Sequence, residues 1–315
     1  MSNLPFTVIG GYLGAGKTTL LNRLLTEARG RRIAVLVNDF GSVNIDATLV
    51  AGHEGGTINL ANGCMCCSLV DGFAQAIGEI RARADRLDHV VIEASGVADP
   101  ARIARYGQMY DLPLDGILVV ADAERVRTQA EDKYVGDTVI RQFGQADLIV
   151  VNKTDLVSAA QVAKIQEWLG SLAPGVPIVL TQMAEVPLDI LLGAHDERSP
   201  APAGSKSEAT TNQHAHAVHA TWTLERTEPV GRDAIARFAA GLGPDIYRAK
   251  GFVHLAEDPG RRYIFQQVGP RSSLEPDRDW TPDPPRTVLV VIGRPDATNV
   301  ASLERLLASV PPVRH

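Results

Sequence analysis

The sequence has few cysteines, few aromatic residues and no long uninterrupted hydrophobic run. Aromatic residues make up 5% of the 315 residues, whereas hydrophobic residues as a whole make up 45%, a share that excludes a chain disordered throughout. No segment approaches the roughly 18 consecutive apolar residues that a membrane-spanning helix needs. Met1 to Phe6 has no basic stretch of the kind that opens a secretory signal. We therefore expect a cytoplasmic protein with no membrane partner.

The sequence also lacks an excess of positive charge. Its 31 Lys and Arg residues face 37 Asp and Glu residues, for a net charge of −6. This balance argues against a general nucleic-acid binder, and we expect no nucleic-acid partner. The length exceeds that of a typical single domain, so two domains are expected.

The only three cysteines, Cys64, Cys66 and Cys67, lie within four residues of one another. A tight cluster with an odd number of cysteines cannot be a disulfide framework. It could hold small buried cysteines, a redox pair or a metal ion. Two or three thiolates favour Zn²⁺ or another late transition metal, and three leave a coordination position for a carboxylate, an imidazole or water. The absence of cysteine elsewhere favours the metal site.

Residues 1–193 alternate short apolar runs with amphipathic segments, which predicts a doubly wound, mostly parallel α/β sheet. The expected strands are Phe6 to Ile9, Ile33 to Val37, His89 to Glu93, Gly116 to Ala121, Leu148 to Val151 and Val176 to Leu180. The expected helices are Lys17 to Arg29, Ser68 to Leu87, Pro100 to Met109, Val135 to Phe143 and Ala159 to Leu172.

The pattern changes after residue 193. Residues 194–217 are polar and rich in Ser, Thr, Pro and Ala, which is typical of a linker. Residues 218–315 then predict a small α+β domain. Its expected strands are Val218 to Leu224, Gly251 to Leu255, Tyr263 to Val268 and Thr287 to Ile292, and its expected helices are Gly231 to Ala240 and Asn299 to Val310.

Residues 11–18 fit the phosphate-binding pattern G-x-x-x-x-G-K-[ST] between an expected strand and an expected helix. Backbone N–H groups and the helix N-terminus would hold the phosphates. Lys17 would reach the β- and γ-phosphates, and the Thr18 hydroxyl would bind Mg²⁺. The alternative is a tight glycine-rich turn. The nucleotide-binding residues expected here are Gly11, Gly14, Ala15, Gly16, Lys17, Thr18 and Thr19.

The sequence Asn-Lys-Thr-Asp at residues 152–155 indicates which base is bound. A carboxylate can accept hydrogen bonds from both N1–H and the 2-amino group of guanine, and adenine offers no such pair. We expect Asp155 to select guanine while Asn152 and Lys153 hold the base and its loop. Discrimination of this kind is large when the wrong base leaves buried polar groups unpaired, so the expected substrate is GTP.

Glu93 ends an apolar run, and Gly96 follows three residues later. A carboxylate here can hold Mg²⁺ through water or orient the attacking water, and Gly96 can offer its N–H to the γ-phosphate. An acidic residue at a strand end is also common without such a role. Asp39 is a candidate Mg²⁺ or water contact or a plain turn residue. The candidate catalytic residues are thus Lys17, Glu93 and Asp39.

His214, His216 and His219 stand close together at the end of the expected linker. Histidines at this spacing can capture a metal ion weakly, so we consider a secondary metal site there. Solvated loop residues are the alternative.

Together, these motifs resemble those of the CobW-like GTPases, and the resemblance extends over nearly the whole chain. The matching segments are Gly11 to Leu21, Val37 to Gly41, Asn62 to Cys67, Glu93 to Pro100 and Asn152 to Asp155, followed by Tyr247 to Gly251, Gln267 to Gly269 with Arg271, and Leu274 to Pro276 with Trp280. The resemblance implies GTP hydrolysis coupled to delivery of Zn²⁺ or Co²⁺ bound by the cysteine motif. Many members have a glutamate where this chain has Ser42, so Asp39 or Glu54 would have to replace that metal contact.

The leading hypothesis is a GTP-hydrolysing metallochaperone of low basal activity that serves a client metalloprotein. Zn²⁺ suits three thiolates best, and Co²⁺ or Ni²⁺ also fits. The alternative is a zinc-responsive regulatory GTPase that binds partners without delivering metal. A kinase of a small metabolite is disfavoured by residues 152–155. A homodimer could complete the hydrolytic site, but no residue of the sequence demonstrates one.

Overall fold

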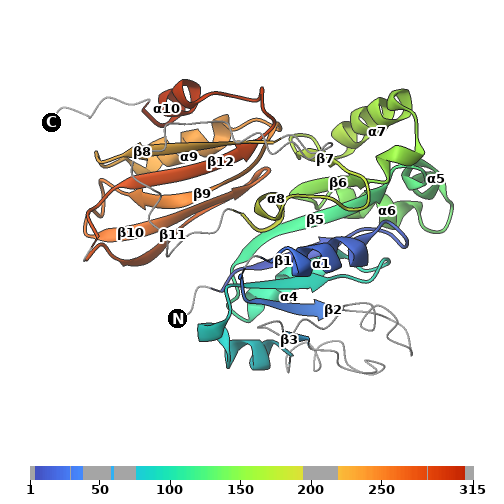
Figure 1. Cartoon of the computed structure of the whole chain (residues 1–315), viewed down its shortest axis with the longest axis horizontal. Coiled ribbons are helices and arrows are strands. Elements are labelled where there is room, and N and C mark those ends of the chain that lie inside the picture. The colour runs from blue at the N-terminus through green and yellow to red at the C-terminus, as the bar shows by residue number, and fades with distance from the viewer. Residues whose placement is uncertain are drawn as a thin grey trace. The chain divides into compact units, whose positions relative to one another are not determined.

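The computed structural model describes residues 4–28, 30–37, 58–59, 76–193, 219–281 and 283–308, with only the backbone of residues 58–59. The chain divides into two compact units, Met1–Leu192 and Gly193–His315, each visible in Figure 1. Among the described residues, none of the helices is both long enough and apolar enough to cross a membrane.

The first unit is built on a seven-stranded sheet with the order β3-β2-β4-β1-β5-β6-β7. All its strand pairs are parallel. Every residue of β1, β4 and β6 is buried, as expected for parallel strands covered on both faces. The strands are β1 (Phe6–Gly10), β2 (Ile33–Val37), β3 (Ile58–Asn59), β4 (His89–Glu93), β5 (Leu114–Asp122), β6 (Leu148–Asn152) and β7 (Ile178–Leu180).

The connections of this sheet reverse direction at β1. Helix α1 (Lys17–Thr26) leads from β1 toward β2 on one side, whereas α4 (Pro100–Met109) leads from β4 across to β5 on the other. Right-handed crossovers that run in opposite directions place their helices on opposite faces. Phe6 and Val8 of β1 pack with Ile103 of α4 in the main core cluster. The crevice at such a reversal, at the carboxyl ends of the strands, is where α/β proteins bind ligands.

The predicted α/β class is confirmed, and β2, β4, α4 and α7 have the predicted bounds. The predicted helix Ser68 to Leu87 is wrong at its C-terminal end, because the helix of residues 76–81 gives way to a turn and the short 3₁₀ helix η1 (Ala84–Arg86). Residues 68–75 lie outside the described part. The remaining elements are α5 (Val126–Glu131), α6 (Gly136–Phe143), the 3₁₀ helix η2 (Thr154–Leu156), α7 (Ala159–Leu172) and α8 (Leu188–Leu192).

The second unit is an antiparallel five-stranded sheet with the order β11-β10-β9-β12-β8. Its core joins alternate residues of the strands, such as Phe265 and Val291, to Phe238 of α9 and Leu303 of α10. The predicted α+β character is confirmed. The elements are β8 (Ala220–Arg226), α9 (Arg232–Gly241), β9 (Ile246–His254), β10 (Arg261–Val268), β11 (Arg271–Asp279), β12 (Thr287–Gly293) and α10 (Val300–Ala308).

Strand β11 was not predicted from the sequence. It is an edge strand that pairs only with β10 in the described sheet, and all its residues but Leu274 are exposed. An edge strand tolerates proline and charge, and Pro276 and its charged neighbours give no alternating apolar pattern.

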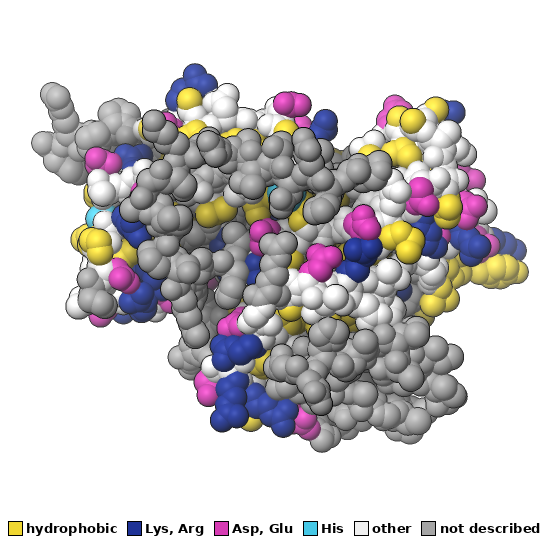
Figure 2. Space-filling view, viewed as in Figure 1, with side chains coloured by type: hydrophobic (Ala, Val, Ile, Leu, Met, Phe, Trp, Pro, Cys, Tyr) yellow, Lys and Arg dark blue, Asp and Glu magenta, His cyan; other side chains and the backbone are white. Residues whose placement is uncertain are grey.

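Charges of both signs are interspersed on the described surface. Figure 2 shows Lys and Arg side chains beside Asp and Glu side chains over much of the face in view, with one group of Lys and Arg side chains near its lower edge. Among the described residues, ion pairs such as Arg32–Asp88 at 2.7 Å and Arg127–Glu131 at 3.2 Å join charges of opposite sign. The described part of that face therefore carries no broad field of one sign.

Candidate functional site

The glycine-rich loop lies between the carboxyl end of β1 and the start of α1. Gly16 immediately precedes α1 with φ +105°, a left-handed conformation that glycine adopts without strain. A Cβ at this position would lie only 2.4 Å from the Asn152 amide nitrogen. Lys17 is buried, and its Nζ donates to the Tyr12 carbonyl at 3.4 Å. Of the other loop residues predicted to bind nucleotide, Gly11 and Ala15 are buried, Thr18 is half-buried, and Gly14 and Thr19 are exposed.

Thr18 and Glu93, from two separate predicted motifs, lie side by side. The Thr18 hydroxyl donates to Glu93 Oε1 at 3.0 Å. Glu93 ends β4 and is only 3% exposed. A hydroxyl beside a carboxylate at a helix N-terminus supplies the oxygen ligands that Mg²⁺ prefers, so the side chains fit the cation that the sequence predicts.

Asn152 links the glycine-rich loop to a second loop. Its amide nitrogen donates to the Ala15 carbonyl at 3.1 Å, and its Oδ1 accepts from the Ala184 N–H at 2.9 Å. Since Asn152 is 2% exposed, both hydrogen bonds are shielded from water. The glycine-rich loop and the segment that begins at Asn152 are therefore joined directly.

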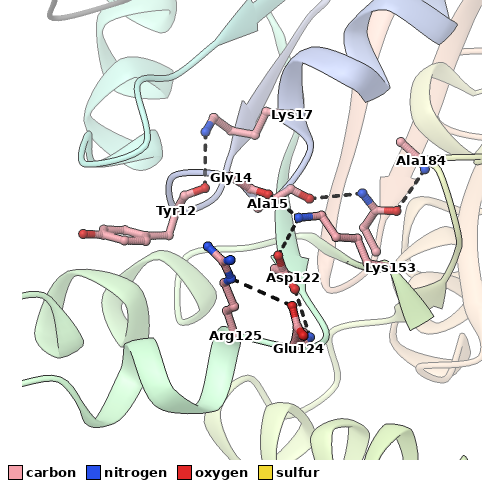
Figure 3. Close-up of polar contacts among 10 residues, drawn as sticks. Tyr12, Gly14, Ala15, Lys17, Asp122, Glu124, Arg125, Lys153 and Ala184 are labelled. Atoms are coloured by element: carbon pink, nitrogen blue, oxygen red, sulfur yellow. Dashed lines mark hydrogen bonds and ion pairs between the residues drawn. The ribbon is translucent and has the colours of Figure 1, made fainter. Parts of the chain in front are cut away.

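Lys153 makes a parallel link. Its backbone is left-handed, with φ +62°, and its Nζ donates to the Gly14 carbonyl at 2.8 Å and to Asp122 Oδ2 at 2.6 Å (Figure 3). Asp122 is buried, and its other oxygen accepts from the Glu124 N–H at 2.9 Å. Sequence reasoning missed Asp122. The available signal was a carboxylate at the end of the apolar run Gly116 to Ala121.

Asp155 lies in η2 with its side chain exposed. Within the described part of the chain, its carboxylate accepts no hydrogen bond that would compete with a ligand. The preceding residue is fixed, because the Thr154 hydroxyl donates to the Thr181 carbonyl at 3.0 Å. The Asp155 carboxylate thus stands at the surface on an anchored turn.

The loop that contains Gly96 packs tightly. The buried side chain of Gln142 on α6 donates to the carbonyls of Gly96 at 3.2 Å and Ala98 at 2.8 Å. A Cβ on Gly96 would lie 2.8 Å from the Leu13 backbone nitrogen. Sequence reasoning missed Gln142, which carries no motif. Its contacts tie the segment after Glu93 to α6, and Gly96 of that segment lies close to Leu13 of the glycine-rich loop.

Several predicted residues lie outside the described residues: Asp39, Cys64, Cys66, Cys67, His214 and His216. His219 is described and half-buried just before β8. In the described ranges, no group of three or more His, Cys, Asp or Glu side chains could hold a metal ion. The metal-binding predictions therefore stay predictions.

The parallel sheet, the glycine-rich loop that opens α1 and the adjacent hydroxyl and carboxylate define a P-loop nucleotide-binding protein. Residues 5–180 match the CobW/HypB/UreG nucleotide-binding domain, and residues 219–310 match the cobalamin synthesis protein cobW C-terminal domain. The chain belongs to the CobW/HypB/UreG family.

Named relatives span most of the chain. It is 32% identical to the zinc chaperone CobW of Pseudomonas aeruginosa, over 93% of this chain and 88% of that protein. It is 28% identical to the zinc chaperone YjiA of Escherichia coli, over 93% and 95% respectively. The crystal structure of Zn(II)-bound YjiA GTPase from E. coli gives a TM-score of 0.45 at 26% identity, covering 99% of this chain and 100% of that chain.

Proposed function

We propose that this protein binds and hydrolyses GTP and couples its nucleotide state to the transfer of a transition metal, with Zn²⁺ as the leading candidate, to a client metalloprotein. The observation that carries the proposal is the pair of links from Asn152 and Lys153 to the glycine-rich loop. These links support a single site with a phosphate side and a base side. Relatives named zinc chaperones support metal as the cargo.

On the phosphate side, Lys17 and the backbone N–H groups of the loop would bind the β- and γ-phosphates of GTP. Thr18 would hold Mg²⁺ directly and Glu93 through a water molecule. The bound cation supplies neutralisation of the negative charge that develops on the phosphates. Glu93 would also orient the attacking water, and Gly96 would present its N–H to the γ-phosphate. Asp39 remains a candidate for a further contact with the cation or the water.

On the base side, Asp155 would accept hydrogen bonds from guanine N1–H and the 2-amino group. Its exposed carboxylate and the anchored turn that carries it support this role. Adenine would leave the carboxylate without donors, and this mismatch is the basis of selection.

The metal cargo is assigned to Cys64, Cys66 and Cys67. Support comes from the chemistry of the thiolates, which favours Zn²⁺ while also fitting Co²⁺ or Ni²⁺. It also comes from chain order, because Val37, after which the segment with Asp39 and the cysteines begins, pairs with Glu93 in the sheet. The γ-phosphate and the metal would then influence each other's binding. We also propose a secondary, weaker metal site at His214, His216 and His219.

We assign the proposed roles to three predicted parts of the chain. Residues 1–193 would form the GTPase domain, 194–217 the linker, and 218–315 the domain that recognises the client or gates access to it. A homodimer would add a second copy's groups to the hydrolytic site.

The cysteine hypothesis is tested by metal analysis of the purified chain with and without GTP, beside a Cys66→Ala variant. We expect the variant to bind less metal. An unchanged metal stoichiometry would remove the cysteines as the cargo site.

A second candidate function is a zinc-responsive regulatory GTPase, in which hydrolysis times the release of a partner. The cysteine cluster serves this function equally well. GTP-dependent transfer of metal from the loaded protein to an apo-client separates the two. Transfer supports the chaperone, and partner release without transfer supports the regulator.

A further inference from the structure

Arg23 of α1 holds the loop that follows β7. Its Nε donates to the Met183 carbonyl at 2.8 Å, and its Nη2 donates to Glu185 Oε1 at 2.6 Å. Arg23 lies six residues after Lys17 on the helix that opens at the glycine-rich loop. The planar guanidinium can serve both acceptors at once. The loop of residues 181–185 is therefore tied to the helix of the phosphate site.

This loop has an unusual backbone that needs support. Met183 and Ala184 are consecutive non-glycine residues with φ +49° and +57°. A left-handed conformation is unfavourable for residues with a Cβ, and it persists where surrounding contacts impose it. Asn152 holds the Ala184 N–H, and the Thr181 hydroxyl donates to the Glu185 carbonyl at 2.8 Å. Arg23 adds two contacts from α1, to the Met183 carbonyl and to the Glu185 carboxylate.

The same loop borders the base side of the site. Both the N–H and the hydroxyl of Thr154 donate to the Thr181 carbonyl, at 3.2 and 3.0 Å. Asp155 directly follows Thr154 in the chain, and Met183 presents an exposed side chain from the loop. A change in the conformation of residues 181–185 would therefore alter the surroundings of a base bound at Asp155.

We propose that Arg23 is a positioning residue for guanine selection, which it promotes by holding residues 181–185 in their left-handed conformation. The inference rests on the proposed function, since it assumes that Asp155 binds guanine. Arg23 acts through the Met183 carbonyl and the Glu185 carboxylate and contacts none of the phosphate-binding groups assigned above. Its loss should weaken the base-dependent part of nucleotide binding and leave the triphosphate-dependent part intact.

The test measures the dissociation constants of GTP and ATP, both with Mg²⁺, for the full-length wild type and for Arg23→Met. We expect GTP to bind roughly three- to tenfold more weakly, as for a charge-assisted but partly solvated contact. ATP binding should stay unchanged, so the preference for GTP over ATP falls by the same factor. Arg23→Lys should also lose preference, because an ammonium group lacks the fork that reaches both acceptors.

Glu27→Gln is the matched control. It removes the other ion pair of Arg23, a 3.6 Å contact with the residue that follows α1, without touching residues 181–185. We expect it to keep the wild-type preference. If Arg23→Met does not fold, Glu185→Gln removes the ion pair alone and should give a smaller loss in the same direction.

An equal loss of GTP and ATP affinity would overturn the inference, because it would make Arg23 a support of α1 only. An unchanged preference in a folded Arg23→Met would overturn it as well. Failure of the proposed function has a different signature, visible without any change at Arg23. In that case the wild type would not prefer GTP over ATP, or Asp155→Asn would keep the preference, and both proposals would fall.

Discussion

The Thr18 hydroxyl donates to Glu93 Oε1 at 3.0 Å and so joins the first turn of α1 to the end of β4. The two residues are far apart in the sequence and meet because β1 and β4 are parallel neighbours. Their carboxyl ends share one edge of the sheet, where the N-terminus of α1 also adds its positive dipole end. The pair thereby places two side-chain oxygens beside the glycine-rich loop.

Removing the Thr18 hydroxyl or the Glu93 carboxylate should weaken the binding of Mg²⁺ that GTP hydrolysis requires. We expect Thr18→Ala and Glu93→Gln each to raise the Mg²⁺ concentration for half-maximal GTP hydrolysis by about 10- to 100-fold, the usual effect of losing such support at a metal site. Thr18→Ser keeps the hydroxyl and should stay near wild type. Wild-type Mg²⁺ dependence in both variants would refute the assignment.

Asp122→Asn should weaken GTP binding, although Asp122 lies outside the predicted nucleotide-binding motifs. Its carboxylate orients Lys153, and loss of this charge-assisted contact is expected to cost about 1–2 kcal/mol, or roughly 5- to 30-fold in the dissociation constant. Isothermal titration with GTP measures the effect. The exposed Asp296 offers a control for the same substitution in the second unit. Equal affinities for Asp122→Asn and Asp296→Asn would contradict the role.

Gly96→Ala should damage the site by crowding Leu13. The added methyl would lie 2.7 Å from the Leu13 side chain and 2.8 Å from its backbone nitrogen, and overpacking of this kind costs about 1–3 kcal/mol. We expect lower thermal stability and slower GTP hydrolysis.

Gly170→Ala on α7 is the matched substitution, because a Cβ there meets no atom within 4 Å. It should stabilise the fold by about 0.5–1 kcal/mol through helix propensity, with hydrolysis unchanged. Similar losses of activity in both variants would show that the effect at Gly96 is not local crowding.

Zinc should change GTP affinity, and GTP should change zinc affinity by the same factor. Titration of GTP into the zinc-loaded and the chelator-treated protein measures the first factor, and titration of zinc with and without GTP measures the second. Zinc binding should also weaken at acid pH as the thiols of Cys64, Cys66 and Cys67 become protonated. Identical GTP affinities with and without saturating zinc would contradict the proposed coupling between zinc binding and GTP binding.

Tyr247 should make the second unit sensitive to alkaline pH. Burial raises the pKa of its phenol; Arg294 opposes this shift and Asp245 adds to it. Since the folded state favours the neutral phenol, its stabilisation is complete below the ordinary pKa near 10 and is lost as pH rises toward the folded-state value. Urea unfolding between about pH 8 and 11 measures the decline. Tyr247→Phe should show less of it, and an equal decline in both proteins would contradict the prediction.

The sequence predicts the framework well where local signals and burial agree. β4 carries the apolar run Val90 to Ile92 between His89 and Glu93. Helix α4 begins at Pro100 after Asp99, whose side chain accepts from the Arg102 N–H. The helix α7 likewise starts with a capping box formed by Ser158 and Gln161. In contrast, α5 buries only Val126 and offers no apolar stripe, so periodicity does not reveal it.

The site is predicted less completely, for a physical reason. Lys17, Thr18 and Asn152 belong to motifs of fixed spacing, which local sequence can show. Asp122 and Gln142 act through contacts with residues distant in the chain, namely Lys153 and Gly96. Such contacts depend on strand order and helix placement, which residue types alone do not specify.

The pairing of Val37 with Glu93 has a mechanical consequence. β2 and β4 share a continuous ladder from Ile33 opposite His89 to Val37 opposite Glu93. Neither strand can slide along the other without breaking the hydrogen bonds of that ladder. Val37, the last residue of β2, is therefore held in place where the segment that carries Asp39 and the cysteines begins. A piston-like movement of β2 past β4 is therefore blocked, and Val37 and Glu93 keep their places beside each other while the ladder is intact.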